Sequence, residues 1–226
     1  MTASRPVEVA PERLEGWIAR FTGSHGEVTW SLAPSEDPGA SPSAYLLSAA
    51  DGSWARLQGW AEAPGPQLPP DLSPTAAWAR PPGPVLTVLV RRGGYAVAVS
   101  SADGRLLASK VGTRRVQSRT AAGGWSQQRF ARRRANQADE LVGALVGHAA
   151  RVLEEGEGRG GPVGALVLGG DPSLAAQALA ELGVGARRRL PDLPSRDLPD
   201  LPDPRRAVLE EALRRGRAVR VRVHNA

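Results

Sequence analysis

The hydrophobic pattern at the start of the chain changes from a helical spacing to a strand spacing. Residues 10–21 carry large apolar side chains at the i, i+3, i+4, i+7 spacing of an amphipathic helix, namely Leu14, Trp17, Ile18 and Phe21. A short strand is predicted at 27–32. The apolar runs 45–47 and 54–57 flank Asp51-Gly52, a turn-forming pair, and predict a β-hairpin. The first part of the chain is therefore expected to form a small α+β region.

The rest of the chain has a longer and more regular pattern. The predicted strands are 85–91, 95–100, 105–111, 163–168 and 218–224, with 114–119 as a further candidate. The predicted helices are about 127–153, 172–182 and 204–215. A Gly-rich turn is predicted at 155–161 and a loop at 190–204. Antiparallel strands followed by alternating helices and strands predict an α/β fold, with a mixed sheet flanked by helices.

Two local signals support these helices. The long helix has an inward stripe made of Phe130, Ala138, Leu141, Val142, Leu145, Ala149 and Val152. Asp171 fits the N-cap of the next helix, and Pro172 fits its first helical position.

A proline-rich stretch divides the chain. Eight prolines lie between residues 63 and 84, which predicts a linker or an extended segment. The charge balance changes at the same place: residues 1–82 carry 5 basic and 9 acidic groups, and residues 83–226 carry 24 and 14. We therefore predict an N-terminal region of residues 1–82 and a second domain of residues 83–226.

Composition excludes several kinds of chemistry. The chain has no cysteine, which excludes disulfides, thiolate metal sites, Fe–S clusters and a cysteine nucleophile. The three histidines are scattered, and His148 fits the edge of a packed helix better than a ligand position, so we expect no metal and no cofactor. The sequence has no Gly-x-Ser-x-Gly elbow, and its single lysine, Lys110, follows no Gly-rich loop. Apolar runs far shorter than about 20 residues, with no secretory signal, predict a cytoplasmic protein without a membrane partner.

Positive charge is concentrated in one part of the second domain. Nine cations and no carboxylate lie between residues 105 and 134. An uncompensated patch of this kind favours a polyanionic partner, most commonly nucleic acid. The alternative is a solvated helix face that is balanced by acidic groups elsewhere.

Within this stretch, residues 123–134 combine several features of an RNA contact. Gly123 and Gly124 allow the backbone to turn freely and approach a ligand closely. Ser126 is placed to cap a helix whose first turns carry Arg129, Arg132, Arg133 and Arg134. Free amides at a helix N-terminus favour phosphate, and the arginines extend that field. The amide side chains of Gln127 and Gln128 add donors and acceptors without charge.

This pattern, Gly-Gly-x-Ser-x-x-Arg-Phe-Ala-Arg-x-Arg from Gly123 to Arg134, resembles a motif in eukaryotic and archaeal peptide-chain release factors. In their middle domain a Gly-Gly-Gln loop opens a long helix and enters the peptidyl-transferase centre. The resemblance extends over about residues 85–182, including Thr113-Arg114-Arg115-Val116 and Leu166–Pro172. It implies the release-factor middle-domain fold, which has RNase H-like topology.

The glutamine is displaced from its position in those factors. Aligned without gaps, the release-factor glutamine falls on Trp125, and the first glutamine here is Gln127. A displaced glutamine resembles the Vms-type release factors, and their actinobacterial branch, which lacks zinc-finger and ankyrin regions, is the most similar. The resemblance implies Gln127 as the catalytic glutamine, with Gln128 as a possible substitute.

The resemblance also implies the reaction and the partners. The expected activity is hydrolysis of the ester that joins a nascent peptide to tRNA on a stalled large ribosomal subunit, in ribosome-associated quality control. An intact ribosome and free peptidyl-tRNA remain open as alternative substrates, and the protein is expected to be a monomer. Gly123 and Gly124 would permit the loop path. Residues expected to contact rRNA or tRNA are Arg115, Arg119, Trp125, Arg129, Arg132, Arg133 and Arg134.

Two other functions remain open. A non-catalytic RNA- or ribosome-binding module of the same fold is favoured by Trp125, which could stack on a base. A tRNA-cleaving nuclease would need clustered carboxylates, and none occurs between Asp103 and Asp139. The five tryptophans of the N-terminal region are expected to form a core, with a docking surface for tRNA or a ribosomal protein as the alternative.

Overall fold

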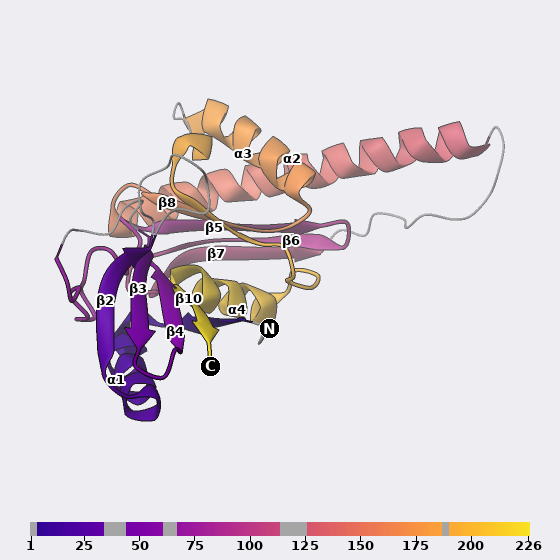
Figure 1. Cartoon of the computed structure of the whole chain (residues 1–226). Helices are drawn as coiled ribbons and strands as arrows, with labels where there is room; N and C mark the ends of the chain where they lie inside the picture. The colour runs from indigo at the N-terminus through magenta and orange to yellow at the C-terminus, as the bar shows by residue number, and fades with distance from the viewer. Residues whose placement is uncertain (1–3, 34–43, 61–66, 114–125, 187–189) are drawn as a thin grey trace. The chain divides into compact units, whose positions relative to one another are not determined.

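The computed structural model describes residues 4–33, 44–60, 67–113, 126–186 and 190–226, with the side chains of 126–136 and 185–186 left out. The elements are, in chain order, β1 (Arg5–Val9), η1 (Pro11–Arg13), α1 (Leu14–His25), β2 (Val28–Ala33), β3 (Ala44–Ala49), β4 (Trp54–Gln58), β5 (Val85–Arg91), β6 (Gly94–Ser100), β7 (Leu106–Thr113), α2 (Ser126–Gly160), β8 (Ala165–Gly170), α3 (Pro172–Ala186), η2 (Leu190–Asp192), β9 (Ser195–Leu198), α4 (Arg206–Arg217) and β10 (Val219–His224) (Figure 1). They form two units: residues 1–82 with 217–226, and residues 83–216.

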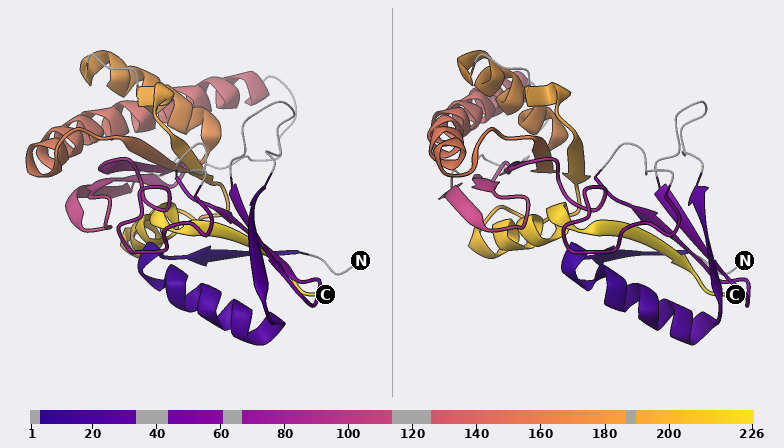
Figure 2. Two further views of the ribbon diagram at one scale, coloured as in Figure 1. Left: turned by 60° about the vertical axis from the view of Figure 1, so that its left-hand side comes forward. Right: turned by 90° about the vertical axis from the view of Figure 1, so that its left-hand side faces the viewer.

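The first unit is a five-stranded antiparallel sheet with α1 along one face (Figure 2). The strand order is β1-β10-β4-β3-β2. Leu14, Ile18 and Phe21 are buried as the helical spacing predicts, although the helix continues to His25. The predicted hairpin is present as β3 and β4, with Gly52 at a φ of 90° in its turn. The α+β prediction for this region is confirmed.

The terminal strand belongs to this first sheet, which corrects its predicted place in the second domain. β10 pairs with β1 on one side and β4 on the other, both antiparallel. Its valines are buried at alternate positions, the pattern of a strand with one face on a core. Such alternation predicts a strand but does not specify its sheet. The chain therefore passes from the first unit to the second at residues 82–83 and returns at 216–217.

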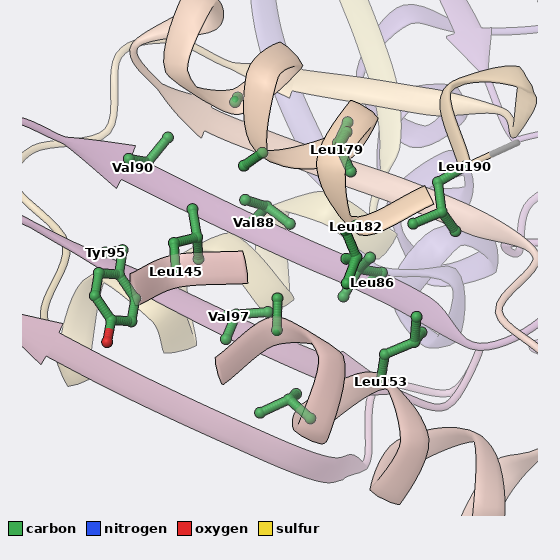
Figure 3. Packing of buried hydrophobic residues seen from close by; sticks show 14 of the residues in the cluster. Leu86, Val88, Val90, Tyr95, Val97, Leu145, Leu153, Leu179, Leu182 and Leu190 are labelled. Carbon is green, nitrogen blue, oxygen red and sulfur yellow. The ribbon is translucent and has the colours of Figure 1, made fainter. Parts of the chain in front are cut away.

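The second unit contains a mixed five-stranded sheet, which confirms the predicted α/β class. The strand order is β7-β6-β5-β8-β9; β5, β6 and β7 form an antiparallel meander, and β8 and β9 run parallel to β5. Helices α2 and α3 pack on one face through side chains such as Leu145 and Leu179 (Figure 3). Helix α4 packs on the other face, where Gly216 lies against Val167. Coverage on both faces explains why β5 and β6 are buried along almost their whole length and are rich in apolar residues.

Two predictions in this unit were wrong. Residues 155–160, predicted as a turn, are the last helical residues of α2. Gly156 and Gly160 lie where a Cβ would meet Val99 and Leu107, so these glycines allow the helix to pack closely on β6 and β7. The helix ends at Gly160, and the next residue, Gly161, has a φ of 84°. The predicted loop at 190–204 contains η2 and the short edge strand β9.

The predicted start of α3 is confirmed. Asp171 Oδ1 accepts hydrogen bonds from the backbone N–H groups of Ser173 and Leu174, at 3.0 and 3.3 Å. The candidate strand at 114–119 lies outside the described residues.

Candidate functional site

Helix α2 carries the predicted site at its N-terminal end and is anchored by its C-terminal part. The helix has 35 residues, a length of about 52 Å at 1.5 Å per residue. Its buried side chains are Leu141, Val142, Leu145, Ala149, Val152 and Leu153. Residues 126–140 contain almost no large apolar side chain, so this part has little to bury against a sheet. Figure 1 shows α2 continuing past the ends of the strands that its C-terminal part covers.

The backbone of α2 begins at Ser126, which places Gln127 and Gln128 in its first turn. The first backbone N–H groups of a helix have no partner within the helix and can donate to a ligand. Helical spacing places position 127 on the same side as position 134, and position 128 on the same side as position 132. The two glutamine positions therefore occupy different sides of the helix.

Charge is separated along α2. Residues 126–138 contain four arginines, Arg129, Arg132, Arg133 and Arg134, and no carboxylate, whereas residues 139–160 contain five carboxylates and two arginines. A cation in the first turn of a helix opposes the helix dipole, at a cost of about 0.3–1 kcal/mol, and Arg129 lies in the first turn of α2. Helix stability alone does not favour this arrangement. A bound polyanion would offset the cost, and phosphate groups provide such a charge.

The structure gives the backbone of six predicted site residues and omits five others. Gln127, Gln128, Arg129, Arg132, Arg133 and Arg134 lie in the first turns of α2. Arg115, Arg119, Gly123, Gly124 and Trp125 lie outside the described residues.

His148 lies in the anchored part of α2 and packs as the sequence suggested. Its ring stacks on Tyr95, with centroids 5.8 Å apart. Arg151 Nη2 lies 2.6 Å from His148 Nδ1, a contact in which the guanidinium donates to an unprotonated nitrogen. Burial, followed by the positive charges of Arg151 and Lys110, lowers the pKa of His148 below its usual value of 6.5.

This pKa predicts a direction for the pH dependence of stability. Because the folded pKa lies below the unfolded one, the unfolded chain takes up the proton first as the pH falls through 6.5. Lowering the pH from about 7.5 to about 5.5 should therefore reduce the free energy of unfolding more for the natural protein than for His148→Gln. Urea denaturation at a series of pH values measures this difference. Parallel pH dependences would contradict the prediction.

Possible metal ligands and one pocket of the described residues also bear on the chemistry of the chain. Among the described residues, no group of three His, Asp or Glu side chains is placed to hold a metal ion. A pocket between α3 and the strands β8 and β9 is mainly apolar, and its lining includes one hydroxyl, Ser195, and one carboxylate, Asp197. None of the described helices is long and apolar enough to cross a membrane.

Comparison with protein families identifies the group to which this fold belongs. Residues 83–222 match the model of the Actinobacteria/chloroflexi VLRF1 release factor. The chain belongs to this release-factor family. The match begins where the second unit begins, includes α2 with its glutamines and arginines, and ends within β10. No curated protein matches the chain. Membership confirms the resemblance found in the sequence and indicates a role in translation, in association with the ribosome.

Proposed function

We propose that this protein is a peptidyl-tRNA hydrolase that releases nascent chains from stalled large ribosomal subunits in the cytoplasm. The observation that carries the proposal is the Gly123-Gly124-x-x-Gln127 motif at the start of α2, in a chain that belongs to a release-factor family. The substrate is the ester between the peptide and the 3′-terminal adenosine of tRNA. The protein acts as a monomer.

The reaction is the addition of water to an ester carbonyl. Water attacks the carbonyl carbon, the bond to the ribose oxygen breaks, and that oxygen takes a proton, leaving a free peptide acid and tRNA. Glutamine is too weak a base to remove a proton from water. The proposed role of Gln127 is to orient the water through its side-chain amide. Backbone N–H groups near the start of α2 would stabilise the oxyanion that develops.

The positive charges of α2 are proposed to position the protein on the ribosome. Arg129, Arg132, Arg133 and Arg134 would hold rRNA or tRNA phosphates, and Arg115 and Arg119 would extend this contact. Much of the catalytic environment would come from the ribosome. This is consistent with a site made of a loop, two glutamines and cations.

A non-catalytic RNA- or ribosome-binding module is the second candidate. Trp125 stands where the release-factor glutamine aligns, and an indole ring stacks well on a base. In that function the arginines would have the same role, but no ester would be cleaved.

The deciding experiment is peptide release from purified stalled 50S–peptidyl-tRNA complexes. The proposal expects a free peptide together with full-length tRNA on a denaturing gel. Salt-sensitive ribosome binding without release would contradict hydrolysis and favour the binding module. Shortened tRNA would instead indicate a nuclease.

A further inference from the structure

The sheet of the first unit has a second face, opposite the one that packs on α1. Along β4 and β10 the residues facing the core are Ala55, Leu57, Val219, Val221 and Val223. The alternate residues point to the other face and are half-buried or exposed; they are Trp54, Arg56, Gln58, Arg220, Arg222 and His224. We call these six residues the β4–β10 strip.

The register of the two strands arranges the strip in three directly opposite pairs. Gln58 is opposite Arg220, Arg56 is opposite Arg222, and Trp54 is opposite His224. The rings of Trp54 and His224 are stacked, with centroids 5.6 Å apart and an interplanar angle of 19°. One end of the strip is therefore a stacked pair of aromatic rings, and guanidinium groups follow it along both strands.

The pairing of charges across β4 and β10 does not maximise the stability of the sheet. Like charges directly opposite each other on neighbouring strands are destabilising, and Arg56 and Arg222 occupy such positions. The remaining positions on this face are mostly neutral and include Pro6, Thr29, Ser31, Leu46 and Ser48. Glu8, opposite Arg220, is the one carboxylate among the strand residues of this face, against three arginines. The described strand residues of this face therefore carry net positive charge, which complements a polyanion.

We propose that the β4–β10 strip binds a single-stranded or loop segment of RNA. Arg56, Arg220 and Arg222 would contact phosphates, and a base would stack beside the Trp54–His224 pair. Aromatic side chains on an open sheet face, next to cations, are a general solution for binding unpaired RNA. This contact lies in the first unit and does not depend on the hydrolysis proposed for the start of α2.

The charge contribution is tested with the full-length protein and a fluorescein-labelled single-stranded RNA of about 12 nucleotides, followed by fluorescence anisotropy. The test variant is Arg56→Gln/Arg222→Gln. The matched control is Arg13→Gln/Arg20→Gln, which removes two charges from exposed positions of η1 and α1 in the same unit. The test variant should bind about tenfold more weakly, and its slope of log K against log salt should be smaller by about 1.4, from about 0.7 per lost phosphate contact. The control should retain the affinity and slope of the natural protein.

The aromatic contribution is tested by Trp54→Ala and Trp54→Phe. Alanine should weaken binding about tenfold, and phenylalanine should restore most of the affinity because it retains a ring that can stack. Rescue by phenylalanine separates stacking from a general loss of structure. Equal RNA affinity for the natural protein, the double arginine variant and Trp54→Ala would overturn the proposal and leave an acidic protein surface as the partner to test.

Parallel release assays separate this proposal from the enzymatic one. Weaker RNA binding by the strip variants, with no release by the natural protein, would retain the RNA surface and reject the hydrolase. Peptide release by the natural protein, with RNA binding unchanged in the strip variants, would retain the hydrolase and reject the RNA surface.

Discussion

Replacing Gln127 by alanine is expected to reduce peptide release from stalled 50S complexes by about 100-fold or more, the usual effect of removing one group that stabilises or orients the reacting centre. Binding to the large subunit should remain within about twofold of the natural protein, because the arginines that are proposed to supply most of the affinity are unchanged. Alanine is the best helix former, so the substitution should not weaken the first turn of α2. Release is measured by single-turnover kinetics, and binding by co-sedimentation at several salt concentrations.

The matched control is Gln128→Ala, which makes the same change at the neighbouring position of α2. Because positions 127 and 128 lie on different sides of the helix, one glutamine can face the ester while the other faces away. Gln128→Ala should therefore release peptide at close to the natural rate. Full release by Gln127→Ala with loss in Gln128→Ala would move the catalytic role to Gln128. Full release by both variants would remove the glutamines from the mechanism.

Replacing Gly156 by alanine is expected to lower the free energy of unfolding by about 1–2 kcal/mol. Alanine in a helix gains about 1 kcal/mol over glycine, but a Cβ at position 156 would lie 2.4 Å from the Cβ of Val99. That atom belongs to a β-branched side chain on the central part of the sheet and cannot move without shifting β6 or α2. Overpacking of this kind costs about 1–3 kcal/mol and outweighs the helical gain. Urea denaturation followed by circular dichroism measures the difference.

Gly143→Ala is the control for this substitution. Gly143 lies in the same helix and is exposed, and a Cβ there would meet no atom within 4 Å. The helical gain is then unopposed, so stability should rise by about 0.5–1 kcal/mol. Opposite signs for the two glycines would support close packing of α2 on β6. Stabilisation by both substitutions would show that α2 does not approach β6 as closely as the structure indicates.

The sequence predicted the fold best where the hydrophobic pattern was long and its partners were near in sequence. The antiparallel meander of β5, β6 and β7 follows from apolar runs joined by short turns, and the stripe of α2 from Leu141 onward is buried as predicted. β9 was missed because its four residues include Arg196, which is buried and donates to the carbonyl of Gly216, 3.2 Å away. A buried arginine that binds a helix end has no distinctive sequence pattern.

The site at α2 and the β4–β10 strip differ in how far the sequence could predict them. Gln127 and the arginines of α2 are close together in the sequence, so the motif and its place at the start of a helix were visible without coordinates. The strip combines residues 54–58 with residues 220–224, which are brought together only by the pairing of β4 and β10. The prediction that the N-terminal tryptophans form a core holds for Trp17, Trp30, Trp60 and Trp78, whereas Trp54 lies on the opposite face.

The position of β10 has a consequence for how this protein is made. During synthesis β1 emerges first, but its only neighbour in the described sheet, β10, follows after the whole of the second unit. Until then β1 has no strand to pair with, and β4 presents an open edge that could pair with another chain. Residues 1–82 produced alone should therefore aggregate or remain incompletely folded. A separately folding version of this unit would need residues 217–226 joined to its own N-terminus, ahead of β1.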